Sequence, residues 1–301
     1  MKKKILIIGG TGFIGYHLAQ KSLQKKWDVT SISSHKVRKK RFLKNVKYIY
    51  CDISKKNSLK KIQNKDYDHV VNLGGYVNHQ DKVKTMASHF TGCKNLSNFF
   101  LKKKLLSFTQ MGSSVEYGKT KSPQKENVKL SIKNLKSTYG KAKLSATKHL
   151  IELYKKKNFP VTILRLYLTY GPKQDLNRLI PITINSCLEN KNFPCSYGTQ
   201  YRDFVYIDDV IRAIFNTINN KKTRGQIINI GSGNPIQVKN IINIIKNISK
   251  GGKPQFGMIK LRKDEILKLY PDTNKAKNIL KWKPITTFKS GIKKTINLFN
   301  E

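Results

Sequence analysis

The chain has 301 residues, 38% of them hydrophobic, and a formal net charge of +43. This length allows a large buried core, and no apolar run approaches the roughly 20 residues that span a bilayer. The chain has a basic start, but the apolar stretch 5–8 that follows is too short for a signal peptide, and glycines interrupt it. We therefore expect a globular, soluble, cytoplasmic protein without a membrane segment.

The positive charge is carried mainly by lysine, since only eight of the 60 basic residues are arginine. A nucleic-acid binder would explain such a charge. However, the lysines are spread along the whole chain and accompany abundant Asn and Ile, as AT-rich codons would give. We therefore do not expect nucleic acid to be the main partner.

Four cysteines, at positions 51, 93, 187 and 195, form no CxxC pair, and no His/Cys group has zinc-ligand spacing. We expect reduced structural thiols and no metal site.

In chain order, the first half alternates apolar strands with amphipathic helices. The expected strands cover residues 4–8, 29–33, 46–50, 70–73, 105–110 and 161–166, and the helices 13–24, 88–102 and 138–155. Such alternation predicts an α/β fold with a doubly wound parallel (Rossmann) sheet.

After position 170 the pattern changes to shorter segments, with helices at 179–188 and 208–218 and a strand at 227–230. We expect residues 1–170 to form a dinucleotide-binding domain to which 204–230 return. Residues 171–203 and 231–301 would form a smaller, C-terminal substrate-binding lobe.

A glycine-rich loop directly follows the first strand and opens the first helix. Its glycines are Gly9, Gly12 and Gly15, with Phe13 and Ile14 between the last two. Gly9 permits a tight turn, Gly12 lets the backbone approach a pyrophosphate, and Gly15 lets helix and strand pack closely. The free N–H groups of the helix N-terminus suit the phosphates. The three glycines at this spacing therefore favour a dinucleotide-binding loop over an ordinary strand–helix turn.

The segment after the second strand indicates which dinucleotide binds. NAD sites usually carry an acid there for the ribose 2′-hydroxyl. Here residues 31–38 contain no acid but include Ser33 and Arg38, which suit a 2′-phosphate. NADP(H) is thus favoured, with NAD(H) possible. Asp52, after the third strand, could accept a hydrogen bond from adenine or cap the following helix.

Tyr139 and Lys143 lie four residues apart and so share one helix face. A tyrosine beside an ammonium can serve as a general acid or base at a carbonyl or alcohol carbon. A surface tyrosine beside a solvated lysine is the alternative. Ser113 follows the fifth strand, at the sheet edge where ligands bind, and could hydrogen-bond the reacting oxygen.

With these residues in this order, the chain resembles the extended short-chain dehydrogenase/reductases that act on sugar nucleotides. The matching stretches are 9–15, 52–53, 72–75, 113–118, 139–143, 164–172, 202–210, 229–233 and 280–284, which together span nearly the whole chain.

The resemblance implies roles for individual residues. Ser113, Tyr139 and Lys143 would be the catalytic triad, with Lys143 also holding the nicotinamide ribose. Beside the glycine loop, the cofactor would contact Asp52, Ile53, Leu73, Gly74, Tyr139 and Lys143. The substrate would contact Ser114 and the nucleotide-diphosphate-gripping arginines Arg178, Arg202 and Arg262. Guanidinium groups suit such a diphosphate because they bind phosphate bidentately.

Several positions depart from the family pattern. Sugar-nucleotide 4,6-dehydratases carry an acidic pair where this chain has Ser114 and Val115, which argues against dehydration. Glu116 lies one place further on and is interpreted as structural. Leu168 replaces a usual substrate-contacting Asn. His89 replaces a helical Asn of the family and is interpreted as a structural histidine. His79 would either line the substrate pocket or have a structural role in its loop.

Together these features predict an NAD(P)-dependent oxidoreductase acting on a nucleotide-diphosphate sugar, first of all a 4-keto-sugar reductase in deoxy-sugar or surface-polysaccharide biosynthesis. The alternative is a 4-epimerase of the UDP-glucose 4-epimerase type, and the second alternative an RNA-binding protein of the same fold. The resemblance also implies a homodimer formed through the helices at 88–102 and 138–155.

Overall fold

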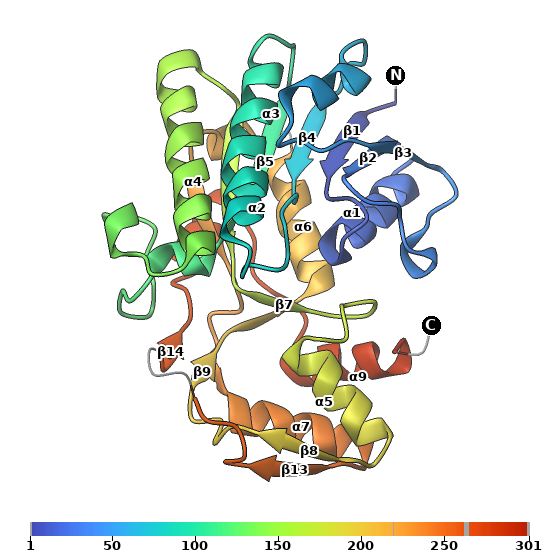
Figure 1. Cartoon of the computed structure of the whole chain (residues 1–301), viewed down its shortest axis with the longest axis vertical. Coiled ribbons are helices and arrows are strands. Elements are labelled where there is room, and N and C mark those ends of the chain that lie inside the picture. Colours follow the sequence, from blue (N-terminus) through green and yellow to red (C-terminus); the bar gives the residue numbers. More distant parts are fainter. Residues whose placement is uncertain (1, 219, 262–264, 300–301) are drawn as a thin grey trace.

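The computed structural model describes residues 2–218, 220–261 and 265–299. A parallel sheet of seven strands, in the order β11-β6-β5-β4-β1-β2-β3, forms its larger part (Figure 1). In chain order these strands are β1 (Lys4–Ile8), β2 (Asp28–Ser33), β3 (Val46–Tyr50), β4 (His69–Asn72), β5 (Ser107–Ser113), β6 (Val161–Leu166) and β11 (Ile227–Ile230). The predicted Rossmann-type α/β fold is confirmed.

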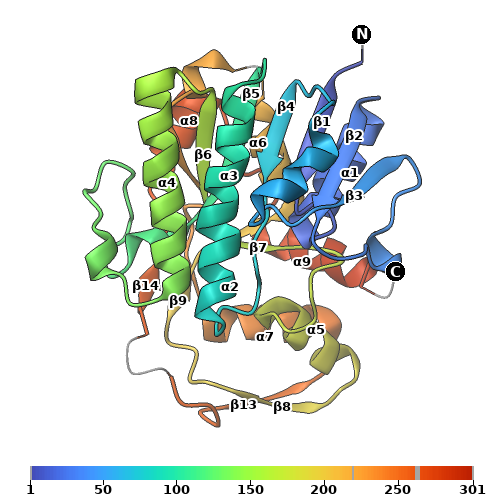
Figure 2. The same ribbon diagram turned by 45° about the horizontal axis from the view of Figure 1, so that its top comes forward.

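Both faces of the sheet are covered by helices, and the central strand β1 is accordingly apolar on both sides. In β1, Ile5 and Ile7 belong to one buried cluster, while Leu6 and Ile8 belong to another. Figure 2 shows α3 and α4 in front of the sheet, with α1 and α6 behind it. The helices of these layers are α1 (Phe13–Gln24), α2 (Lys82–Met86), α3 (Gly92–Leu101), α4 (Thr138–Lys157) and α6 (Ile207–Thr217).

Two predicted boundaries differ from the structure in ways that affect the site. The helix expected at 88–102 begins at Lys82, capped by Asp81, and passes through a π-helical segment, Ala87–Thr91. The strand expected at 105–110 instead runs from Ser107 to Ser113. Ser113 is therefore the last residue of a buried strand, which holds its backbone firmly.

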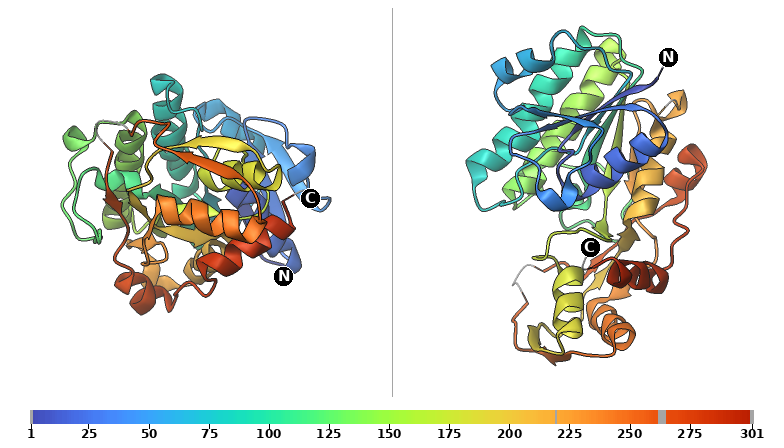
Figure 3. Two further views of the ribbon diagram at one scale, coloured as in Figure 1. Left: turned by 90° about the horizontal axis from the view of Figure 1, so that it is seen from below. Right: turned by 90° about the vertical axis from the view of Figure 1, so that its right-hand side faces the viewer.

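The remaining helices and strands, except α8, form a smaller lobe below the carboxyl ends of the large sheet (Figures 1 and 3), whereas α8 packs against β11 and α6 of the larger part (Figure 2). Helix α5 packs against α7, and the parallel pair β8–β13 flanks them. The bounds are β7 (Leu168–Tyr170), α5 (Leu179–Leu188), β8 (Asn192–Cys195), β9 (Tyr201–Arg202), β10 (Phe204–Tyr206), β12 (Ile236–Gln237), α7 (Val238–Ser249), β13 (Lys253–Phe256), β14 (Lys268–Leu269), α8 (Asn274–Leu280) and α9 (Phe288–Asn297).

The strand order reverses between β1 and β4, so the loops that follow these two strands leave the sheet side by side. A Cβ atom at position 9 would lie only 3.0 Å from the Leu73 carbonyl group. Such reversal points form the crevice in which open α/β sheets bind ligands. Here that crevice opens toward the smaller lobe.

Candidate active site

The glycine-rich loop has the geometry that its sequence predicts. Gly9 has φ +76°, in the left-handed region that favours glycine. Gly12 is the N-cap of α1, and its N–H donates to the Gly9 carbonyl oxygen at 3.0 Å. A Cβ atom at position 15 would lie 2.3 Å from that same oxygen. Gly15 thus permits the close approach of α1 to the loop, while Phe13 and Ile14 begin the helix.

The segment after β2 joins the glycine loop to the smaller lobe. Ser33 Oγ accepts a hydrogen bond from Thr11 Oγ1 at 2.9 Å. The Arg38 side chain is 72% exposed, with a nitrogen 3.6 Å from the Asp175 carboxylate. Arg41, for which the sequence predicted no role, is buried and donates to Asp175 at 2.9 Å and to the Lys173 carbonyl oxygen. The scarcity of arginine in this chain was the only sequence feature that could have indicated a role for Arg41.

Asp52 and Ile53 lie beside the same crevice. Asp52 Oδ1 accepts hydrogen bonds from the N–H and the hydroxyl of Ser54, at 3.0 and 2.7 Å. Asp52 thus closes a local turn and does not cap the following helical turn, Lys56–Ile62, whose N-cap residue is Lys55. Ile53 is buried, and its carbonyl oxygen accepts from Asn95 Nδ2.

The three residues predicted to be catalytic come from β5 and α4. Lys143 is buried, with Nζ donating to the Met111 carbonyl oxygen at 2.8 Å and lying 5.8 Å from the centroid of the Tyr139 ring. Ser113, two residues beyond Met111, accepts a hydrogen bond from the Val115 N–H at its hydroxyl oxygen. The fold thus brings Lys143 against the strand that ends in Ser113.

Two histidines pack on the Tyr139 ring, a contact that the sequence did not predict. The His79 ring stacks on it with centroids 3.9 Å apart and an interplanar angle of 9°. The His89 ring meets it edge-on at 4.9 Å, and His89 Nε2 lies 3.2 Å from the Tyr76 carbonyl oxygen. Gly75 makes room for this arrangement, because a Cβ there would lie 1.8 Å from His89 Cε1. The histidine pair therefore fixes the position of the phenol ring.

Both imidazoles favour the neutral form. Burial, with a smaller contribution from the nearby Lys143 charge, lowers the pKa of His89 to about 3. Burial, followed by the charges of Arg178 and Lys143, also lowers the pKa of His79.

We expect a His89→Asn variant to flatten the pH dependence of stability in acid. With its folded pKa at about 3, His89 stays neutral in the folded state as pH falls below 6.5, while the unfolded chain takes up the proton. Stability is thus lost from pH 6.5 downward, by up to about 1.4 kcal/mol per pH unit. Urea denaturation between pH 7 and 5 measures this slope. Equal slopes in variant and wild type would contradict the assignment.

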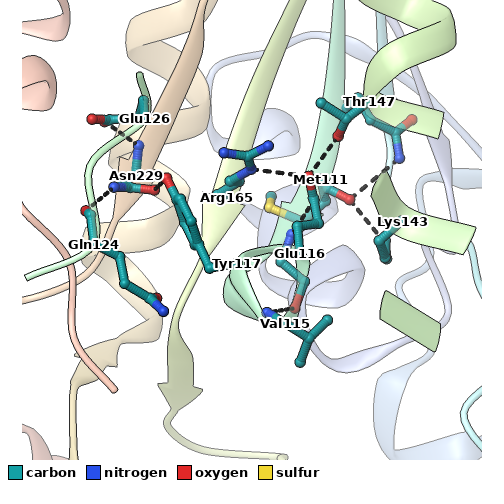
Figure 4. A network of polar contacts seen from close by, with 12 residues as sticks. Met111, Val115, Glu116, Tyr117, Gln124, Glu126, Lys143, Thr147, Arg165 and Asn229 are labelled. Atoms are coloured by element: carbon teal, nitrogen blue, oxygen red, sulfur yellow. Dashed lines mark hydrogen bonds and ion pairs between the residues drawn. The ribbon is translucent and has the colours of Figure 1, made fainter. Parts of the chain in front are cut away.

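Glu116 lies at the centre of a buried polar network between β5, α4 and β6 (Figure 4). Its Oε1 accepts from the Ser113 N–H at 2.8 Å. Its Oε2 accepts from Thr147 Oγ1 at 2.8 Å and from Arg165 Nε at 2.9 Å. Because these donors occupy the carboxylate, Glu116 is held away from any role as an acid in water elimination.

The residues predicted to bind substrate occupy different environments. Arg178 is exposed and is the N-cap residue of α5. Arg202 is largely buried, and its guanidinium donates to Glu265 and to the Tyr201 carbonyl oxygen. Ser114 is buried directly after β5, and Leu168 is half-exposed in β7. Arg262 lies outside the described residues.

The described part of the chain offers neither a metal centre nor a membrane-spanning helix. Within ranges 2–218, 220–261 and 265–299, no group of three or more His, Cys, Asp or Glu is placed to hold a metal ion. No helix in these ranges has the length and apolarity needed to cross a membrane. Cys51, Cys93, Cys187 and Cys195 are buried free thiols.

The fold and the glycine loop define a Rossmann-type α/β protein, and solved structures share its architecture. UDP-glucose 4-epimerase of Thermotoga maritima, solved with UDP-glucose, superposes with a TM-score of 0.91 over 98% of both chains, at 24% identity. UDP-glucuronic acid 4-epimerase of Bacillus cereus, solved with UDP-glucuronic acid and NAD, is 27% identical, with a TM-score of 0.86 over 99% of this chain and 98% of that one.

Residues 5–231 match the model of the NAD dependent epimerase/dehydratase family, and the chain belongs to this family. A putative UDP-glucose 4-epimerase of Methanocaldococcus jannaschii is 30% identical over 97% of both chains. A UDP-N-acetyl-alpha-D-glucosaminuronate decarboxylase of Bacillus cytotoxicus is 27% identical over 100% of this chain and 99% of its own. The chain is therefore an enzyme of the sugar-nucleotide epimerase/dehydratase type.

Proposed function

We propose that this enzyme reduces the C4 carbonyl of a nucleotide-diphosphate 4-keto sugar with NADPH. The observation that carries the proposal is the segment after β2, which is cationic and contains no acid. Its Arg38 side chain is 72% exposed, so the guanidinium could contact a 2′-phosphate. Residues 31–41 contain only basic ionisable groups, and the Asp175 carboxylate beside them is paired with Arg41 at 2.9 Å.

The residues present fit a nicotinamide dinucleotide. Gly9 and Gly12 leave no side chain above the N-terminus of α1, where a pyrophosphate would meet free N–H groups. Lys143 presents a buried ammonium beside Tyr139, where it would hold the nicotinamide ribose. Leu73 and Gly74 would line the opposite wall of the crevice, next to Gly9.

When bound, the reduced nicotinamide would supply the hydride that C4 receives. Tyr139 gives its phenolic proton to the carbonyl oxygen, so the ketone becomes a hydroxyl, and solvent later restores that proton. Ser113 donates a hydrogen bond to the same oxygen. The Lys143 ammonium favours the phenolate that Tyr139 leaves behind. The stacked His79 ring keeps the phenol aimed at the substrate.

The substrate side follows from charge. Arg178 is the N-cap residue of α5 in the smaller lobe, and its charge helps to lower the pKa of His79, whose ring stacks on Tyr139. We propose that Arg178, with Arg202, Arg262 and the Ser114 hydroxyl, holds the sugar diphosphate, and that the lobe of residues 171–203 and 231–301 covers it. We also propose a homodimer through α3 and α4, acting in the cytoplasm.

A 4-epimerase is the second candidate, and the named relatives favour it. An epimerase would return the hydride to the opposite face of the same sugar and would retain its cofactor, without net oxidation. The same three residues would serve, since Tyr139 can accept a proton as well as donate one. Neither candidate needs an acid at positions 114 and 115.

The cofactor preference can be tested by titrating the purified protein with NADPH and NADH while following nicotinamide fluorescence. We expect tighter binding of NADPH. We expect Arg38→Ala to weaken NADPH by about tenfold or more, because a charged hydrogen bond contributes about 1.5–3 kcal/mol. NADH affinity should hardly change.

Arg224→Ala is the matched control, because Arg224 lies far from the crevice and donates to the Leu106 carbonyl oxygen. It should leave both affinities unchanged. Copurified NAD, or tighter binding of NADH than of NADPH, would overturn the reductase proposal and favour the epimerase.

A further inference from the structure

Two contacts tie helix α4 to β5 and to the helical turn Ser114–Tyr117 that follows it, and both start from the same face of α4. Lys143 Nζ donates to the Met111 carbonyl oxygen, and Thr147, four residues further along α4, donates to Glu116. Glu116 in turn holds the Ser113 N–H. In the proposed mechanism Lys143 also binds the cofactor ribose, so its contact with Met111 competes with that role. Thr147 has no role in the proposed mechanism, so its contact with Glu116 does not.

The second contact is built into the core. Glu116 is fully buried, and its two oxygens receive three donors from three different elements. Arg165 also stacks over the Tyr117 ring, with its Cζ 4.6 Å from the ring centroid. Tyr117 Oη donates to Asn229 Oδ1 at 2.8 Å, which extends the network to β11 (Figure 4). The carboxylate is therefore fixed relative to the whole sheet.

Only a carboxylate satisfies these donors. The Ser113 N–H, the Thr147 hydroxyl and Arg165 Nε all need an acceptor. A glutamine would turn its own N–H group toward at least one of them. It would also leave the Arg165 charge buried without a counter-ion.

We infer that Glu116 is a positioning residue for the catalytic triad, an inference that rests on the proposed function. Through Thr147 it holds α4, and with it Tyr139, in register with Ser113. This contact would remain when Lys143 Nζ exchanges the Met111 carbonyl oxygen for a cofactor ribose. Precise positioning of these residues matters, because a displacement of about 1 Å at reacting groups can lower the rate about 10²-fold.

The test uses Thr147→Val, which removes one donor without leaving a buried charge. We expect it to lower kcat by about 10²-fold, while KM and the cofactor affinity stay within about twofold. Thr147→Ser keeps the hydroxyl and should restore kcat. Glu116→Gln should lower kcat further, with a loss of thermal stability caused by Arg165.

Thr162→Val is the matched control. Thr162 is an equally buried threonine of β6 that bonds Thr223, away from Glu116. It should lose comparable thermal stability and keep its kcat. An equal fall of kcat in Thr147→Val and Thr162→Val would reduce the role of Thr147 to general stability and overturn the inference.

A second readout does not depend on turnover. Crystal structures of wild type, Thr147→Val and Thr162→Val with bound NADPH would give the distance between Ser113 Oγ and Tyr139 Oη. We expect a shift of about 1 Å in Thr147→Val alone. An unchanged distance would overturn the inference. If the wild type turns over no nucleotide sugar, the proposed function fails, and this distance still decides the role of Glu116.

Discussion

Replacement of Tyr139 by Phe is expected to lower turnover by about 10²–10⁴-fold, the usual contribution of a positioned acid or base. The change removes one oxygen atom and keeps the ring that stacks on His79 and meets His89. Folding and binding should therefore persist while proton transfer is lost. Steady-state kinetics with the substrate that the wild type turns over, together with cofactor titration, measure the two effects separately.

Tyr154→Phe is the control for this experiment, because Tyr154 lies on the same helix, far from Ser113, against Gly225. It should keep the turnover of the wild type. Unchanged turnover in Tyr139→Phe would exclude the proposed role of the phenol in proton transfer.

Two alanine substitutions in the glycine loop are expected to separate folding from binding. In Gly15→Ala the new Cβ would lie 2.3 Å from the Gly9 oxygen and 2.5 Å from Gly10 Cα. These are backbone atoms that cannot rotate away, so we expect a loss of about 1–3 kcal/mol or more in unfolding free energy, and loss of dinucleotide binding with it.

In Gly12→Ala the nearest atom, the Gly9 oxygen, would lie 3.2 Å from the new Cβ, and the φ of −78° suits alanine. We expect a loss of less than about 1 kcal/mol. The methyl group would nonetheless stand where a pyrophosphate should approach, which should weaken binding at least about tenfold, or about 1.4 kcal/mol. Urea denaturation and cofactor titration compare the two variants. Normal cofactor binding by Gly12→Ala would contradict the assignment of this loop.

The sequence allowed the sheet and the glycine loop to be predicted because their signals are local. Strands buried on both faces give short apolar runs, and β1, β3, β6 and β11 have the predicted bounds. Glycines spaced in this way between a strand and a helix are typical of a dinucleotide-binding loop. The family membership that these motifs implied is confirmed.

What could not be predicted depends on contacts between distant segments. The stack of His79 on Tyr139 joins residues 60 positions apart through a loop without periodicity. The π-helical turn that carries His89 has no pattern distinct from an α-helix. Glu116 was correctly interpreted as structural, but its link to Ser113 and Thr147 needs the packing of α4 against β5. Arg41 joins segments more than 130 residues apart.

The net charge of +43 raised a competing hypothesis, a protein of this fold that binds RNA. Family membership and relatives that are sugar-nucleotide enzymes favour catalysis instead. The charge remains a reason to purify the protein at high salt, since lysine-rich surfaces bind polyanions weakly at low ionic strength.

The most direct test of the central claim is the stoichiometry of cofactor consumption. The purified enzyme is incubated with NADPH and a nucleotide-diphosphate 4-keto-6-deoxy sugar, and the loss of reduced nicotinamide is compared with the sugar product formed. A reductase oxidises one NADPH for each 4-hydroxy sugar that appears, and we predict this result. Interconversion of two 4-hydroxy nucleotide sugars without net consumption of cofactor would contradict it and identify a 4-epimerase.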